Sequence, residues 1–208
     1  MKTIKNKAAW FVFAFLAIGV GLYPLMYLMA GGKFGVLFAK STELLANNLW
    51  NLGFYGHITF GGIALMTGWS QFSKKLRNKR LQLHRNLGKT YVFTVLISGI
   101  CAVYIGFYAT GGWATSLGFI LLGLVWLSTT LSAYFAIRRK DIVMHQKMMM
   151  YSYAACFAAV TLRLWLPILH HVVFGEFLAA YKVVAWLCWV PNLMVAHFLV
   201  RKNIAIKV

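Results

Sequence analysis

Histidines and one arginine that stand inside apolar runs are the residues of this sequence best suited to chemistry. His57 begins the string HITFGGIALMTGWSQ, and Arg163 lies inside YSYAACFAAVTLRLWLP. A polar side chain within a membrane is expensive and usually functional. An arginine there needs an anion or a set of carbonyl groups, and the only acidic residues are Glu43, Asp141 and Glu176, outside these runs. We therefore expect Arg163 to meet a ligand carboxylate, such as a haem propionate, or to reach outward to lipid head groups.

Two faces of small residues accompany these polar side chains. At 3.6 residues per turn, one helical face of the first string holds His57, Gly61, Ala64, Gly68 and Gln71. A second such face leads to Arg163 and holds Ser152, Ala155, Cys156 and Ala159. Small residues let helices approach closely in a membrane. We expect the two faces to pack together around a pocket roughly 10–12 Å below the outer surface, capped by His170 and His171.

Three further histidines, His84, His145 and His197, fall near the other ends of the apolar runs. Two neutral imidazoles that face each other across a bundle form the axial ligand set of a b-type haem, and a third would suit a metal. The alternative is that these histidines contact lipid phosphate or cap helices. Asp141 either orients one of the rings as a hydrogen-bond partner or caps the helix that follows it.

The composition predicts that these residues are held by membrane-spanning helices. The chain is 61% hydrophobic and 12% charged, against about 25% charged residues in a soluble domain. We predict one all-α domain over residues 1–208, a six-transmembrane helix bundle. A span needs about 20 apolar residues, and the predicted spans are about 8–30, 49–72, 90–110, 114–137, 148–170 and 181–200. Gly31 and Gly32 would end the first span, and residues 33–48 are predicted to form an interfacial helix.

The net charge of +18 follows the predicted topology. The two tails and the inner connections hold seventeen Lys and Arg, whereas the outer connections hold Lys33, Lys40 and Lys182. Basic residues concentrate on the cytoplasmic side of membrane proteins. We therefore expect both termini in the cytoplasm and anionic lipids as partners, without nucleic acid. The three cysteines form no paired motif, and the motifs of soluble enzymes, such as a phosphate loop or a nucleophile elbow, are missing from the sequence.

Several strings together resemble a bacterial family of predicted membrane proteins, domain of unknown function 2306. They are GHITFGGIALMTGWSQF, LRNKRLQLHRNLGKTYV and RRKDIVMHQKMMMYSYAACFAAVTLRLWLP, and the resemblance covers roughly residues 50–200. The family pattern implies functional positions at His57, Gln71, His84, Asp141, His145, Arg163 and Asn192. Members usually carry Arg where this chain has Tyr151, and often an acidic residue near His197. The resemblance implies the bacterial inner membrane but no activity.

Three functions remain open on these residues. The first is a haem b protein that transfers electrons, with His57, His84 and His145 as iron ligands, Arg163 on a propionate and quinone as a redox partner. A weak local similarity of residues 84–88 to ascorbate-reducible b-type cytochromes agrees with it. The second is a non-enzymatic accessory subunit of a larger membrane complex. The third is a small-molecule or ion carrier whose site is lined by His57 and Arg163.

Overall fold

The computed structural model describes residues 2–30 and 34–205, and these ranges are helical without any strand. The α-helices are α1 (Lys2–Leu22), α2 (Pro24–Met29), α3 (Thr42–Leu45), α4 (Asn48–Gly68), α5 (Lys74–Lys79), α6 (Leu81–Gly106), α7 (Trp113–Arg138), α8 (Ile142–Cys156), α9 (Ala158–Ile168), α10 (Phe177–Leu187) and α11 (Val190–Ala205). Short 3₁₀-helices η1 (Gly35–Ala39) and η2 (Trp69–Phe72) and the π-helix η3 (Leu169–Phe174) complete the described elements. The prediction of an all-helical chain is confirmed.

Five stretches of the described residues are long and apolar enough to cross a membrane. They are Lys7–Tyr27, Leu81–Gly106, Trp113–Arg138, Ile142–Phe174 and Phe177–Lys202. The helix α4 has 21 residues, or about 31 Å at 1.5 Å per residue, yet it does not reach the same hydropathy. Its asparagines, its five glycines and His57 explain this, because they replace apolar side chains that a simple span would carry.

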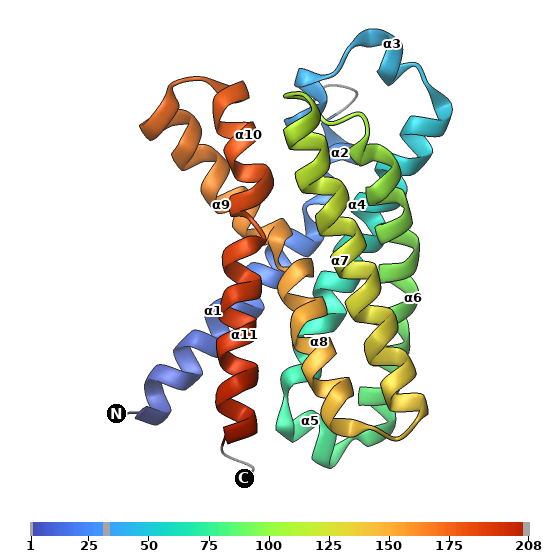
Figure 1. Cartoon of the computed structure of the whole chain (residues 1–208), viewed down its shortest axis with the longest axis vertical. Helices are drawn as coiled ribbons and strands as arrows, with labels where there is room; N and C mark the ends of the chain where they lie inside the picture. The colour runs from blue at the N-terminus through green and yellow to red at the C-terminus, as the bar shows by residue number, and fades with distance from the viewer. Residues whose placement is uncertain (1, 31–33, 206–208) are drawn as a thin grey trace.

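The helices form a bundle with a hairpin that leans away from it (Figure 1). Within the bundle α4 packs on α6, α6 on α7, and α7 on α8, while α1 packs on α4 and α11 on α8. Both ends of the chain lie at one end of the molecule, together with α5 and the connection between α7 and α8. We call this the terminal end. The hairpin of α9, η3 and α10 lies at the opposite end.

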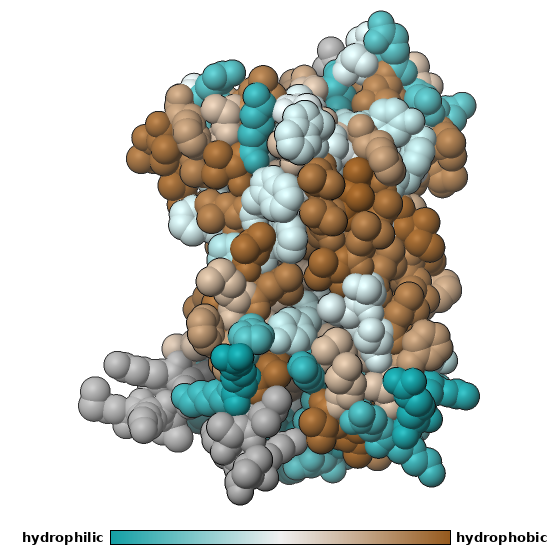
Figure 2. Space-filling view, in the orientation of Figure 1, coloured by the Kyte–Doolittle hydropathy of each residue, from teal (hydrophilic) through white to brown (hydrophobic). Residues whose placement is uncertain are grey.

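The surface has the pattern of a protein that crosses a bilayer. Figure 2 shows hydrophobic side chains across the middle of the molecule and hydrophilic ones gathered towards its two ends. Exposed large apolar residues occur on every long helix, for example Phe11, Phe93, Leu124 and Phe198. In water this much exposed apolar surface would be unfavourable, whereas lipid covers it at no cost.

A circuit of buried hydrogen bonds joins α6, α7 and α8. Trp126 Nε1 donates to Tyr91 Oη at 3.3 Å, Tyr91 Oη lies 2.8 Å from Ser152 Oγ, and Ser152 Oγ lies 2.6 Å from Thr130 Oγ1. Thr130 Oγ1 in turn donates to the carbonyl oxygen of Trp126 at 2.7 Å. A carbonyl only accepts, so Thr130 has used its proton, Ser152 must donate to Thr130, and Tyr91 to Ser152. Each of the four side chains therefore donates one hydrogen bond, and the donors follow one another in a single order from Trp126 through Tyr91 and Ser152 to Thr130.

The predicted boundaries need several corrections. The second predicted span ends as the 3₁₀-helix η2, the fifth and sixth are each broken near their middle, and the predicted interfacial helix is two short pieces, η1 and α3. The small face of α4 packs mainly on α6 rather than on the fifth span: a Cβ at Gly61 would stand 3.0 Å from Ser98 Oγ. Gly31 and Gly32 lie outside the described residues.

The tightest helix contact predicts the effect of one added methyl group. A Cβ at Gly68 would overlap the rings of Tyr153 and Tyr91, so Gly68→Ala should destabilise the fold by about 1–3 kcal/mol. The matched control is Gly19→Ala, because a Cβ there meets nothing within 4 Å. Alanine favours a helix over glycine by roughly 0.5–1 kcal/mol, so the control should melt at the same or a higher temperature. Equal thermal unfolding of both variants in detergent would contradict the close packing of α4.

The circuit predicts a second pair of variants. Ser152→Ala removes the acceptor of Tyr91 and the donor to Thr130 at a site without exposure. Leaving such a buried group unsatisfied costs about 1–3 kcal/mol, so the melting temperature should fall. Ser128→Ala is the control, because Ser128 is exposed on α7 and bonds only to the carbonyl of Val125 among the described residues. A melting temperature of Ser152→Ala equal to that of the control would show that the circuit contributes no stability.

Candidate functional site

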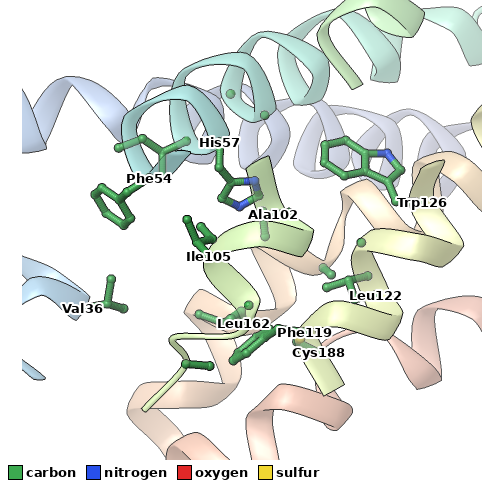
Figure 3. Close-up of a pocket in the computed structure, with 18 of the residues that line it drawn as sticks. Val36, Phe54, His57, Ala102, Ile105, Phe119, Leu122, Trp126, Leu162 and Cys188 are labelled. Atoms are coloured by element: carbon green, nitrogen blue, oxygen red, sulfur yellow. The ribbon is translucent and has the colours of Figure 1, made fainter. Parts of the chain in front are cut away.

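A cavity of about 230 Å³ lies between the bundle and the hairpin, and most of its lining is apolar. Its walls come from α1, α2, η1, α4, α6, α7, α8, α9 and α10. Figure 3 shows His57 projecting from α4 among Phe54, Ala102 and Ile105, with Trp126 across the cavity. The volume is below the range of about 300–1,000 Å³ typical of sites for drug-sized ligands. The cavity therefore suits a small molecule or the head of a larger one.

His57 presents a hydrogen-bond acceptor to this cavity. Its Nδ1 lies 3.1 Å from the carbonyl oxygen of Ser98 and 3.0 Å from Ser98 Oγ. Ser98 Oγ donates its own proton to the carbonyl oxygen of His57 at 2.8 Å. Both oxygens around Nδ1 are therefore acceptors, so Nδ1 carries the proton and the neutral ring keeps its lone pair on Nε2. Nε2 makes no hydrogen bond with any described residue.

Arg163 lines the same cavity and is only partly satisfied. Its Nη1 donates to the carbonyl oxygen of Ala159 at 2.7 Å, and its guanidinium lies 4.3 Å from the centre of the Tyr23 ring. Its Nε is buried without a hydrogen-bond partner in the part of the chain that the structure describes, and that part holds no ion pair. The guanidinium charge is therefore met by one carbonyl and one aromatic face, which leaves a donor for an anion.

Two more donors border the cavity beside its apolar lining. Trp50 is almost fully buried, and its Nε1 has no partner among the described residues. Lys40 follows η1, and its Nζ donates to the carbonyl oxygen of Tyr108 in the connection between α6 and α7. Burial lowers the pKa of Lys40 from its ordinary value. The segment of η1 thus borders the cavity, and Lys40 attaches it to the connection between α6 and α7.

The wall formed by α9 and α10 is attached through two helix breaks. Phe157 separates α8 from α9, and Cys188 and Trp189 separate α10 from α11. Breaking a helix frees carbonyl groups that need donors inside a membrane. Asn192 Nδ2 lies 3.0 Å from the carbonyl oxygen of Cys188 and 3.3 Å from that of Ala154, so one side chain joins both breaks.

Polar residues along α6 and along α8 with α9 fall into three tiers, because α6 and α8 run in the same direction (Figure 1). The middle tier is the contact of Tyr91 with Ser152. Two turns towards the hairpin, α6 carries Ser98, which binds His57, and just beyond the break at Phe157 α9 carries Ala159, which binds Arg163. Two turns towards the terminal end α6 and α8 carry His84 and His145. A step of seven residues keeps the same helical face, so these two histidines lie on the faces of α6 and α8 that carry Tyr91 and Ser152.

The other polar residues of the terminal end have defined places. His145 Nδ1 donates to the carbonyl oxygen of Ala133 at 2.9 Å. Asp141 accepts a hydrogen bond from the backbone of Met144 at 2.9 Å and caps α8, which is the bond that the capping alternative requires. Gln71 Oε1 lies next to Gly88, where a Cβ would stand 3.3 Å from it.

The sequence predicted part of this arrangement. The structure brings His57 and Arg163 to one cavity and His84 and His145 to one tier, but His170 and His171 stack on each other and do not line the cavity. Lys40, Trp50 and Ser98 were missed. His84, Tyr91 and Ser98 are spaced seven residues apart and so share one helical face. This spacing was the signal in the sequence that could have identified Ser98.

The two departures from the family pattern contact each other. Tyr151 Oη and His197 Nδ1 lie 2.9 Å apart between α8 and α11. Where other members carry Arg and an acidic residue at these positions, the same contact would be an ion pair. His197 therefore has its hydrogen-bond partner on α8 at Tyr151.

Comparison with known proteins identifies the family but no activity. The family model described as "Predicted membrane protein (DUF2306)" matches residues 54–200. This is more than two thirds of the chain, so the chain belongs to that family of membrane proteins. No curated protein matches it, and no solved structure does. Within the described residues no three metal-ligating side chains lie together, and the haem sites stay a prediction.

Proposed function

We propose that this membrane protein is a carrier that binds a small organic anion in the cavity of His57 and Arg163. The observation that supports it most is the buried, unpartnered Nε of Arg163 on the wall of that cavity. A guanidinium away from water binds a carboxylate or a phosphate strongly. Because the chain has three acidic residues and all are exposed, the anion has to come from outside the protein.

The chemistry of the lining narrows the ligand. Trp50 Nε1 and Arg163 Nε are hydrogen-bond donors that would bind acceptor oxygens of a ligand. The lone pair on His57 Nε2 is an acceptor that would bind a donor group of the ligand. Leu122, Phe119 and Leu162 supply an apolar remainder. A short-chain carboxylate that also carries a hydroxyl or an acidic proton meets all three demands.

The two helix breaks provide a route for the ligand. The circuit of Trp126, Tyr91 and Ser152 closes the cavity towards the terminal end, whereas α9 and α10 form its wall on the other side. Discontinuous helices near the middle of the membrane are typical of carriers. Rotation of the hairpin about Asn192 would carry Arg163 with it and open the cavity.

The proposed placement is six spans, including α4, with the terminal end in the cytoplasm of a bacterial inner membrane. The length of α4 supports its inclusion. The basic residues of α5 and of the connection between α7 and α8 lie at the terminal end (Figure 1), where anionic lipids would meet them.

Cysteine labelling tests this placement. In a chain without its native cysteines, Trp113→Cys and Glu176→Cys should react with a membrane-impermeant maleimide on intact cells. Asn78→Cys and Arg139→Cys should react only after lysis, because they lie at the terminal end. All four positions are exposed, so a difference in labelling reports the side of the membrane. The reverse pattern, or equal labelling of all four positions, would refute the six-span arrangement with a cytoplasmic terminal end.

Electron transfer through a b-type haem between His84 and His145, with quinone as partner, is the second candidate. The position of the two histidines on one tier supports it, and so does the bond of His145 Nδ1 to a backbone carbonyl, which orients a ring for an iron at Nε2. Oxidised and reduced absorption spectra of the purified protein test it.

The carrier proposal is tested by anion binding. Trp50 and Trp126 line the cavity, so tryptophan fluorescence can follow titration with short-chain aliphatic and aromatic carboxylates and with their neutral amides. Wild type should bind at least one carboxylate and prefer it to its amide. Arg163→Gln should weaken that affinity by about tenfold or more, since a charge-assisted hydrogen bond is lost, and Arg163→Lys should restore part of it.

The control is Lys182→Gln, which removes the same charge from an exposed position outside the cavity lining. It should bind as wild type does. A wild type that binds none of the carboxylates, or an Arg163→Gln variant that binds them unchanged, would contradict the proposal.

A further inference from the structure

A second group of basic side chains meets at the terminal end, away from the cavity. It is built on the tier two turns below the Tyr91–Ser152 contact, where His84 of α6 and His145 of α8 lie on the helix faces that carry Tyr91 and Ser152. Arg85 follows His84 directly in α6, and α5, which packs on α6, brings Arg77 close enough to His84 for their charges to interact. Three helices thus bring four basic or titratable groups to one place.

No residue in the described part of the chain neutralises this group. The described residues contain no ion pair, and Asp141, the acidic residue at this end, uses its side chain to cap α8. His84 Nδ1 is buried and has no hydrogen-bond partner in the described chain. Arg77 and His145 are half-buried, so water screens them less than it screens a surface lysine. The group therefore combines positive charge with at least one unused polar atom.

We propose that His84, His145, Arg77 and Arg85 form a binding site for a phosphate group at the terminal end of the protein. Guanidinium groups bind phosphate oxygens through paired hydrogen bonds, and a histidine ring protonated on both nitrogens adds a charged donor. The phosphate comes either from a lipid head group or from a soluble phosphate compound. This site is independent of the carboxylate site in the cavity, and either one can fail without the other.

The same residues fit an iron less well. A histidine that ligates a metal almost always donates its other nitrogen to a carboxylate, a carbonyl or water, and His145 does so whereas His84 Nδ1 has no such partner. The space one turn above His84 is also filled, since Gln71 Oε1 lies against Gly88. Two neighbouring guanidinium groups favour an anion over a bare cation.

Ligand binding can be measured by thermal stability and by native mass spectrometry of the whole protein in an uncharged detergent. The probes are a short-chain phosphatidate, inorganic phosphate, and the short-chain diacylglycerol that has the same tails without the phosphate. Phosphatidate should bind and raise the melting temperature of wild type, and diacylglycerol should not. Arg77→Gln and His145→Gln should each weaken binding by about tenfold, as expected for one lost charge-assisted bond.

Lys74→Gln is the matched control, because Lys74 is exposed on the same short helix as Arg77, and it should bind as wild type does. Binding of phosphatidate alone assigns the site to a lipid, and equal binding of inorganic phosphate assigns it to a soluble compound. The proposal is overturned if no phosphate probe binds, if diacylglycerol binds equally, or if Arg77→Gln and Lys74→Gln behave alike. A reduced haem band that disappears in His84→Ala would also overturn it, because the pair would then hold iron.

Discussion

The buried hydrogen-bond circuit of Trp126, Tyr91, Ser152 and Thr130 is the constraint on which the rest of the structure depends. Because each donor has one direction, α6, α7 and α8 have a single register in which all four side chains are satisfied. That register sets the tier of His57 and Arg163 above it and the tier of His84 and His145 below it. It also closes the cavity towards the terminal end, since Trp126 belongs to both the circuit and the cavity lining.

On the hairpin side of the circuit, the carbonyl groups at the helix breaks have hydrogen-bond donors, whereas two buried donors at the cavity have no partner among the described residues. The carbonyl groups freed at the two helix breaks have donors in Asn192 and Thr161, so the breaks are stable parts of the fold. Two unpartnered atoms, Arg163 Nε and Trp50 Nε1, lie on residues that line the cavity, whereas a third, Thr115 Oγ1 at the start of α7, lies outside the lining. Buried polar groups normally find partners, and a ligand in the cavity would supply them.

The sequence predicted the helical membrane architecture and the candidate polar residues because both follow from local pattern. Apolar runs set the spans, and polar residues inside them are few enough to single out His57 and Arg163. The break at Phe157 was missed because Phe157 is an ordinary residue of a span, whereas Pro191 at the start of α11 was an available signal for the break at Cys188. Lys40 was assigned to an outer connection, and only the fold of η1 brings it to the cavity. The contact of Tyr151 with His197 joins residues far apart in the chain, so no local pattern could give it.

The central claim is that Arg163 and His57 hold an organic anion inside the membrane. Native mass spectrometry of the protein, extracted mildly from its own membrane without added ligand, tests this claim most directly. We expect wild type to carry a small acidic molecule that solvent extraction releases for identification, and Arg163→Gln, folded to the same melting temperature, to lack it. A wild type that carries no such molecule, or the same molecule retained by Arg163→Gln, would contradict the account.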